Sequence, residues 1–157
     1  MKAAQTFAAL CRMIKIEHSI FALPFAYAGA FLAARGWPDL KVLGLLTLAM
    51  VGIRSFAMAF NRVVDLEYDR QNPRTATRPL VTGEITPWQT WRFCGAMAAV
   101  FVVSCAALNP FRLSLSPVAL ALASLYSFTK RFTWACHFVL GAVIGLAPVA
   151  GWLSVSP

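Results

Sequence analysis

The chain has 157 residues, of which 59% are hydrophobic and only 13% are charged. Soluble domains carry roughly 25% charged residues, so this composition excludes an ordinary soluble domain and indicates an integral membrane protein. The net charge is +8. Most basic residues lie between apolar runs, where the positive-inside rule places them, so no nucleic acid is expected as a partner.

Five apolar runs predict transmembrane helices, each of which needs about 20 mainly apolar residues. They cover residues 19–34, 40–60, 88–108, 113–128 and 134–153. Pro24 lies inside the first run and is expected to kink its helix, which membrane helices tolerate. The second helix is expected to continue past Phe60 into the polar stretch that follows. The predicted fold class is therefore all-α, a polytopic bundle of about five transmembrane helices.

The connections between these runs carry turn and helix-start signals. Prolines and a glycine punctuate a polar loop at residues 71–86. At its end, Thr86 and Pro87 form a pair typical of a helix N-terminus. Shorter turns are expected at residues 35–39, 109–112 and 129–133. Basic residues are in excess in the N-terminal segment, in the 71–86 loop and after the fourth run, which predicts that these segments are cytoplasmic.

A polar stripe follows the second run, in the stretch NRVVDLEYD that begins at Asn61. At about 100° per residue, a helix places Asn61, Asp65 and Asp69 along one face. Glu67 falls on the opposite side. Two carboxylates and an amide oxygen suit Mg2+, which is usually bound through a few carboxylates together with substrate phosphates. The stripe therefore predicts a site for a Mg-diphosphate, while a solvated helix end with ordinary charges stays open as the alternative.

Arg54 lies on the same predicted face but inside an apolar run. A charge there costs roughly 2.5–3.5 kcal/mol, so such residues usually face a polar interior and have a partner. We expect Arg54 and Asn61 to line a substrate pocket. Two structural alternatives stay open, in which Arg54 reaches the membrane surface or pairs with Asp65 for structure alone.

Basic residues from two further stretches are candidates to bind the phosphates, because guanidinium groups match phosphate oxygens bidentately. The first group follows the stripe and consists of Arg70, Arg74 and Arg78. The second stretch is YSFTKRFT, which places Tyr126, Lys130 and Thr133 at helical spacing with Arg131 beside them. It lies at the same predicted membrane face as the stripe. It is either the second wall of a diphosphate pocket or a positive-inside anchor.

These stretches resemble the UbiA superfamily of intramembrane prenyltransferases. NRVVDLEYD fits the family's NxxxDxxxD motif, and NPRTATRPLVTGEIT fits the loop that follows it. YSFTKRFTWACHFVLGAVIG fits the family's YxxxKRxT region. KIEHSIFALPFAYAGAF is similar to the first helix of the 4-hydroxybenzoate polyprenyltransferase branch, which includes members assigned to menaquinone synthesis. The resemblance covers nearly the whole chain.

The resemblance implies a nine-helix fold and the transfer of a polyprenyl group from its diphosphate to an aromatic acceptor. An acceptor such as 4-hydroxybenzoate would place the reaction in ubiquinone or menaquinone synthesis, at a bacterial inner membrane. Asn61, Asp65 and Asp69 would hold Mg2+, and Tyr126 would contact the diphosphate or steady the allylic cation. The residues implied to neutralise the phosphates are Arg70, Arg74, Arg78, Lys130 and Arg131.

The family also has a second aspartate-rich motif, DxxxD, whereas no acidic residue follows Glu84 here. Residues 1–157 are therefore expected to form the N-terminal portion of a single prenyltransferase domain, whose other half is missing or is supplied by a second chain. The alternatives to an enzyme are a truncated, non-catalytic membrane fragment and a small cation carrier. A carrier would need carboxylates near the middle of the membrane, but these lie at a helix end.

Overall fold

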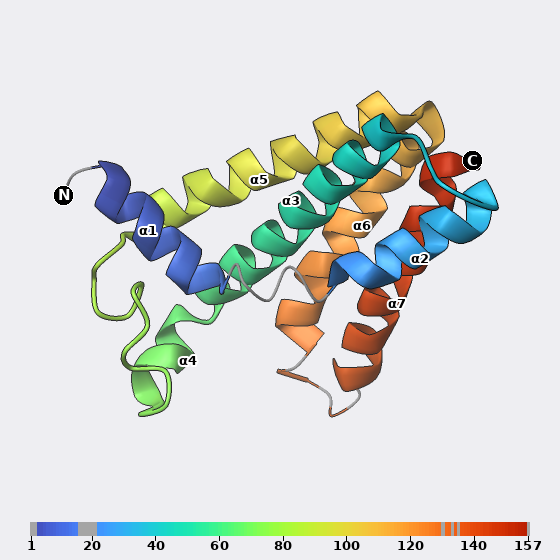
Figure 1. The fold of residues 1–157 in the computed structure, drawn as a ribbon. Helices are drawn as coiled ribbons and strands as arrows, with labels where there is room; N and C mark the ends of the chain where they lie inside the picture. Colours follow the sequence, from blue (N-terminus) through green and yellow to red (C-terminus); the bar gives the residue numbers. More distant parts are fainter. Residues whose placement is uncertain (1–2, 16–21, 130, 133, 135, 157) are drawn as a thin grey trace.

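The computed structural model describes residues 3–15, 22–129, 131–132, 134 and 136–156 (Figure 1). Helices joined by turns and short irregular connections make up these residues, so the all-α prediction is confirmed. The helices are α1 (Ala3–Ile14), α2 (Leu23–Ala34), α3 (Leu40–Val64), α4 (Leu66–Gln71), α5 (Pro87–Leu108), α6 (Pro110–Thr129) and α7 (Cys136–Val155).

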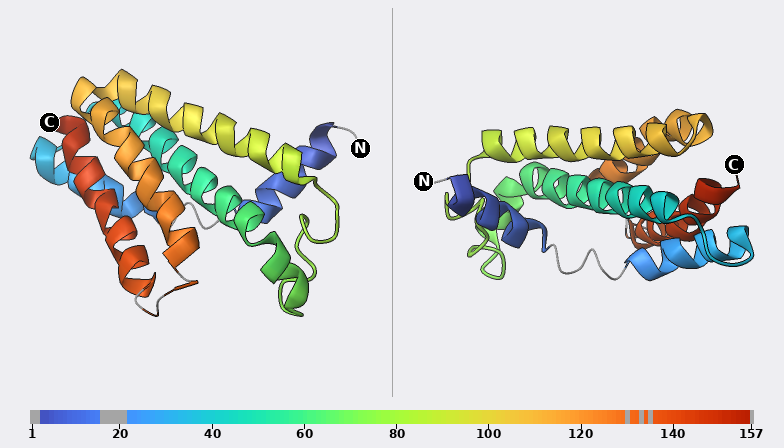
Figure 2. Two further views of the ribbon diagram at one scale, coloured as in Figure 1. Left: turned by 180° about the vertical axis from the view of Figure 1, so that it is seen from behind. Right: turned by 45° about the horizontal axis from the view of Figure 1, so that its top comes forward.

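Four of these helices, α3, α5, α6 and α7, are long and apolar enough to cross a membrane. The first predicted span corresponds to α2, an apolar helix of 12 residues, and its expected start at residues 19–21 lies outside the described residues. In the ribbon views α3 and α5 lie side by side, and α2 lies against α7 (Figures 1 and 2). The short helices α1 and α4 lie together at one end of the bundle, with the polar loop (Figure 1).

One predicted helix boundary is wrong, and the kink expected at Pro24 is not found within α2; the position of a proline explains each difference. Pro24 lies in the first turn of α2 instead of its interior, where a missing N–H costs no hydrogen bond, so it gives no kink within α2. The expected turn at residues 109–112 shrinks to Asn109, because Pro110 already starts α6. The side chain of Asn109 caps the new helix by accepting a hydrogen bond from the Arg112 N–H at 2.8 Å.

The expected start of α5 is confirmed. Thr86 and Gln89 form a reciprocal capping box, in which each side chain accepts a hydrogen bond from the other's backbone N–H. Pro87 occupies the first turn of the helix. This cap ends the polar loop at a defined residue and sets the point at which α5 begins to cross the bundle.

The contact between α2 and α7 is unusually close. A Cβ added at Gly29 would overlap the backbone carbonyl of Pro148, and one added at Gly151 would overlap the carbonyl of Ala26. Small residues allow helix backbones to approach in this way, and close packing is a main source of helix association in membranes. This contact fixes α7 as a wall of the cavity described below.

The helix α1 was not predicted. Its apolar face carries Ala9, Leu10, Met13 and Ile14, which are buried against residues of α3, the polar loop and α5. On its outer side, Arg12 forms an ion pair with Glu84 of the loop. The spacing of the four buried residues is the signal of an amphipathic helix. This packing holds the N-terminal segment against the end of the bundle that carries the polar stripe.

Candidate diphosphate and metal site

The polar stripe begins on α3 and is interrupted at Asp65. The second helix was expected to run through it, but α3 ends at Val64 and α4 starts at Leu66. Helical hydrogen bonding nevertheless continues, because the Asp65 N–H donates to Asn61 O at 3.0 Å and the Asp69 N–H to Asp65 O at 2.8 Å. Both aspartates therefore remain on the inner side of the segment and are buried, whereas Glu67 is exposed.

Asp69 anchors the polar loop. Its carboxylate forms an ion pair with Arg78, nine residues further along the chain. Its backbone carbonyl accepts a hydrogen bond from the Thr75 hydroxyl at 2.7 Å, and Thr75 is itself buried. The loop thus folds back over Asp69 and presents Arg78 to the stripe.

Arg131, which follows α6, contacts the polar stripe. Its guanidinium donates to the Val64 carbonyl at 2.9 Å and to Asp65 Oδ1 at 3.4 Å. It lies over the rings of Tyr68 and Phe128, at 5.0 and 5.6 Å from their centroids, a geometry that favours cation–π attraction. Residues 66 positions apart in the sequence are thereby joined at one end of the bundle.

Asn61 is held by the fully buried Ser127 of α6. Its amide nitrogen donates to Ser127 Oγ at 3.2 Å, which leaves the amide oxygen as an acceptor. Beside it, Phe60 packs against Trp91 and Phe128, with ring centroids 5.6 and 6.0 Å away. These rings join α3, α5 and α6 next to the stripe, so the amide sits on a rigid, apolar support.

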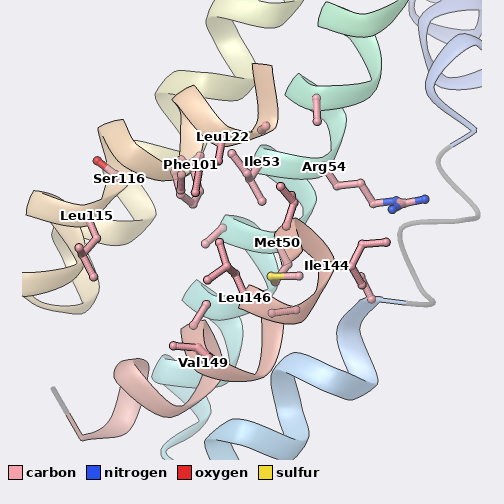
Figure 3. Close-up of a pocket in the computed structure, with 18 of the residues that line it drawn as sticks. Met50, Ile53, Arg54, Phe101, Leu115, Ser116, Leu122, Ile144, Leu146 and Val149 are labelled. Carbon is pink, nitrogen blue, oxygen red and sulfur yellow. The ribbon is translucent and has the colours of Figure 1, made fainter. Parts of the chain in front are cut away.

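A cavity of about 770 Å³ lies in the bundle, and Asn61 is one of its lining residues. Figure 3 shows part of its lining. Its walls are largely apolar and come mainly from α3, α5, α6 and α7. The polar side chains on its lining are few: Arg54, Asn61, Arg112, Ser116 and Tyr126. A mainly apolar cavity with a few polar groups is the usual form of a small-molecule or lipid site.

Arg54 of α3 is part of the lining of this cavity, and its guanidinium points away from the labelled apolar side chains Met50 and Ile53 (Figure 3). It forms no ion pair with an aspartate or glutamate among the described residues, and its buried Nε has no hydrogen-bond partner there. Pairing with Asp65 therefore does not explain Arg54. A buried donor without a partner is costly, so a ligand that accepts this hydrogen bond would be stabilised.

Arg112 lines the opposite end of the cavity and is held structurally. Its guanidinium donates to the Ser154 hydroxyl, and the neighbouring Asn109 amide donates to the Leu153 carbonyl at 2.9 Å. Both partners lie in the last turn of α7, where carbonyl groups favour a nearby cation. Arg112 thus ties the α5–α6 connection to the end of α7.

Not every residue predicted to bind phosphate contacts the polar stripe. Arg70 pairs with the exposed Glu67 at 3.2 Å, and Arg74 is exposed. Helix α6 ends at Thr129, and Arg131 and Phe132 follow with turn hydrogen bonds. Lys130 and Thr133 lie outside the described residues. Tyr126 itself lines the cavity and is partly buried.

Four residues near the stripe were missed by sequence reasoning. Ser127 supports Asn61, Thr75 holds the loop, and Tyr68 packs on Arg131. Arg62 lies within electrostatic reach of Asp65, Asp69 and Arg78. Only Arg62 carried a sequence signal, its charge beside the motif, because the other three are ordinary residue types whose roles depend on the tertiary contact.

The oxygen donors of the stripe fit a hard divalent cation only together with other ligands. Among the described residues, no three His, Cys, Asp or Glu side chains are grouped closely enough to hold a metal. Mg2+ commonly takes one or two carboxylates and completes its shell with water and substrate phosphates. Asp65, Asp69 and the amide oxygen of Asn61 match that kind of site.

The UbiA prenyltransferase family matches residues 22–157, which include the stripe, the loop and the Arg131 segment. The chain belongs to this family. A relative from Photobacterium profundum named 4-hydroxybenzoate octaprenyltransferase is 31% identical, over 98% of this chain and 58% of the relative. One of the same name from Alkalilimnicola ehrlichii is 34% identical, over 76% of this chain and 41% of the relative. The chain thus spans about half the length of these curated relatives.

Solved structures of UbiA homologues share the fold. The apo structure of a homologue from Aeropyrum pernix K1 has 43% sequence identity and a TM-score of 0.84, over 90% of this chain and 51% of that one. A homologue from Archaeoglobus fulgidus bound to GPP and Mg2+ has 23% identity and a TM-score of 0.75, over 95% of this chain and 54% of that one. The chain is thus a multi-pass membrane protein with about half of a UbiA prenyltransferase fold.

Proposed function

We propose that this chain forms the diphosphate-binding half of a polyprenyltransferase that acts on an aromatic acceptor such as 4-hydroxybenzoate. The observation that carries this proposal is the contact of Arg131 with Asp65, at the end of an apolar cavity lined by Asn61 and Tyr126. It joins acidic oxygen donors, cations and a lipid-like cavity in one place. The names of the curated relatives supply the acceptor, and with it a place in quinone synthesis.

Asp65, Asp69 and Asn61 would hold Mg2+ on the diphosphate, with phosphate oxygens completing its ligand shell. Bound there, the ion would stabilise the negative charge of the departing diphosphate. Arg78 and Arg131 are close enough to the carboxylates to neutralise further phosphate charge. Tyr126, on the cavity wall, would face the allylic carbon. The GPP and Mg2+ bound by the Archaeoglobus fulgidus homologue support a metal and a prenyl diphosphate as the ligands.

We assign a weaker role in diphosphate binding to three further residues, Arg70, Arg74 and Lys130. Arg70 and Arg74 are exposed on the same end of the bundle, where they would attract an anionic headgroup from solution. Lys130 precedes Arg131 in the sequence and lies outside the described residues. Their contribution would be to the rate of diphosphate capture more than to its final position.

The cavity would hold the polyprenyl tail and the acceptor. Its apolar walls match an isoprenoid chain and exclude water, which would otherwise hydrolyse an allylic cation. The Nε of Arg54, which has no partner within the described part of the chain, offers a donor for the carboxylate of the acceptor. We therefore assign the acceptor to the part of the cavity next to Arg54.

Membrane placement is part of the same proposal. The relatives come from bacteria, and the basic residues are concentrated at the end that carries α1 and the stripe. We place the chain in a bacterial inner membrane with this end in the cytoplasm, where prenyl diphosphates and the aromatic acceptor would enter.

The alternative is that the chain by itself is a non-catalytic membrane piece. It carries one acidic motif, and the relatives are about twice as long. In this case the second half of the site would come from the rest of the fold, on a longer chain or on a second one. Removing one component of a cooperative electrostatic site costs roughly 10²–10³ in rate, so activity of the isolated chain should be absent.

One experiment separates these functions. The chain is purified into lipid with Mg2+, a polyprenyl diphosphate and 4-hydroxybenzoate, either alone or fused to the C-terminal half of the Photobacterium profundum relative. We expect prenylated product only from the fusion. Turnover by the isolated chain would show that identical copies complete the site, and no product from either protein would contradict the proposed reaction.

Matched substitutions in the active fusion test the assigned stripe. Asp65→Asn removes a buried carboxylate of the site and should lower the rate about 10²-fold or more. Glu67→Gln removes an exposed carboxylate two residues away and should change the rate less than about twofold. Equal losses in the two variants would contradict the assignment of the inner face.

A further inference from the structure

Each of the two buried aspartates of the stripe has an arginine as an ion-pair partner. Asp69 pairs with Arg78, and Asp65 lies 3.4 Å from Arg131. The side chains of the aspartates are 12% and 8% exposed, whereas both arginine side chains are 27% exposed. The carboxylates are therefore largely shielded from water, and arginines supply part of the charge compensation that a bound cation would otherwise provide.

The two arginines lie outside the helices. Arg78 belongs to the loop between α4 and α5, and Arg131 lies beyond the end of α6. Their side chains can therefore turn to a new partner without moving a transmembrane helix. Asp65 and Asp69 are held more tightly, by helical backbone hydrogen bonds and by the Thr75 contact.

The local charge opposes a metal ion that arrives alone. The formal charges of Asp65, Asp69, Arg78 and Arg131 cancel, and Arg62 adds one more positive charge within electrostatic reach. A free Mg2+ would have to displace guanidinium groups and then remain beside them. A metal–diphosphate complex is different, because its phosphate oxygens offer the displaced guanidinium groups new bidentate partners.

We propose that Arg78 and Arg131 are exchangeable counterions that make this site select the metal–diphosphate complex over the free metal ion. Binding of the complex transfers the two guanidinium groups from carboxylate to phosphate oxygens, while the metal takes over the carboxylates. This inference rests on the proposed function, since it assumes that the stripe binds such a complex. It gives the arginines a role in discriminating against the free metal ion, in addition to attracting phosphate.

The inference predicts effects of opposite sign in one variant. Arg78→Gln frees Asp69, so Mn2+ alone should bind about fivefold more tightly, as expected for loss of one partly exposed ion pair. The same variant loses a phosphate partner, so Mn2+ with inorganic pyrophosphate should bind about tenfold more weakly. Arg131→Gln should show the same pair of changes through Asp65.

Both affinities are measured on the whole chain in lipid nanodiscs. Electron paramagnetic resonance of free Mn2+ reports the metal alone, and equilibrium dialysis of labelled pyrophosphate reports the complex. Arg92→Gln is the control, because Arg92 is exposed on α5 and has no ion pair among the described residues. It should leave both affinities within about twofold of the original.

The outcomes are distinct. Tighter Mn2+ binding together with weaker Mn2+–pyrophosphate binding supports the exchange. Unchanged or weaker Mn2+ binding in both arginine variants overturns it, and leaves a plain phosphate-binding role. An original chain that binds no pyrophosphate with Mn2+ contradicts the proposed function, and the inference with it. A misfolded variant would lose both affinities, a pattern that the second variant and a far-UV circular dichroism spectrum distinguish from exchange.

Discussion

Gly151 of α7 lies directly against the backbone carbonyl of Ala26 in α2. A reciprocal contact joins Gly29 of α2 to the carbonyl of Pro148, so each helix contributes a glycine to the crossing. Backbone rather than side chain forms this contact, which leaves little room for adjustment. The position of α7, and with it one wall of the cavity, depends on residues that have no side chain.

We predict that Gly151→Ala destabilises the bundle by about 1–3 kcal/mol, because the added methyl group must push two helix backbones apart. Gly145→Ala is the control, since a Cβ there meets nothing within 4 Å. That change should be neutral or slightly stabilising, because alanine is the better helix former. Unfolding titrations in mixed micelles, followed by circular dichroism, measure both. Equal stability of the two variants would contradict the close crossing.

The orientation in the membrane can be tested with single cysteines in a background without the native ones. Thr77 is exposed in the loop that carries Arg78, and Gly36 is exposed in the turn between α2 and α3. We expect a cysteine at Thr77 to react from the cytoplasmic side and one at Gly36 from the periplasmic side, because basic residues concentrate at the first end. Labelling of oriented vesicles with an impermeant maleimide shows which side of the membrane each cysteine faces. The reverse pattern would invert the proposed topology.

The contact of α1 with the bundle should depend on its apolar face more than on its ion pair. Met13 is 3% exposed, so Met13→Ala should cost about 2–3 kcal/mol of stability. The Arg12 side chain is 60% exposed and that of Glu84 is 38% exposed, so Arg12→Gln should cost less than about 1 kcal/mol. Limited proteolysis at the N-terminal segment, read by mass spectrometry, reports the release of α1. Greater release in the Arg12 variant would show that charge holds the helix.

Arg54 should matter only for acceptors that carry an anionic group. In the active fusion, Arg54→Gln is expected to raise the KM for 4-hydroxybenzoate about tenfold or more, through loss of a charge-assisted hydrogen bond. The KM for the neutral analogue 4-hydroxybenzamide should change much less. Steady-state kinetics with the two acceptors provide the comparison. An equal rise in KM for both acceptors would indicate that Arg54 supports the structure of the cavity and does not bind the carboxylate.

Local features of the fold followed from the sequence. The apolar runs predicted the long helices, because hydrophobic length is a property of a continuous segment. Thr86 and Pro87 predicted the start of α5, because a helix cap is also a local feature: it forms between residues three positions apart. The boundary at residues 109–112 was misplaced, because a single capping residue, Asn109, is enough to separate two helices.

The candidate site was predictable in part. Helical periodicity correctly grouped Asp65 with Asp69 on the inner side and left Glu67 outside, although a one-residue interruption divides the segment. The choice among the basic residues was not predictable. Arg70 and Arg78 look alike in the sequence, yet Arg70 pairs with Glu67 and Arg78 with Asp69. Which guanidinium reaches which carboxylate depends on how the loop folds back.

The sequence by itself determined the class of the protein, its spans and the acidic motif, because hydrophobicity, helical period and motif spacing act over a few neighbouring residues. The tertiary structure decided which distant groups meet. It brought Arg131 to Asp65 and set Ser127 behind Asn61. It also placed Arg54 beside a cavity, with a nitrogen that has no partner among the described residues. These relationships follow from the crossing of whole helices, and a crossing is set by many small contacts, such as that of Gly151 with Ala26, that no short stretch of sequence specifies.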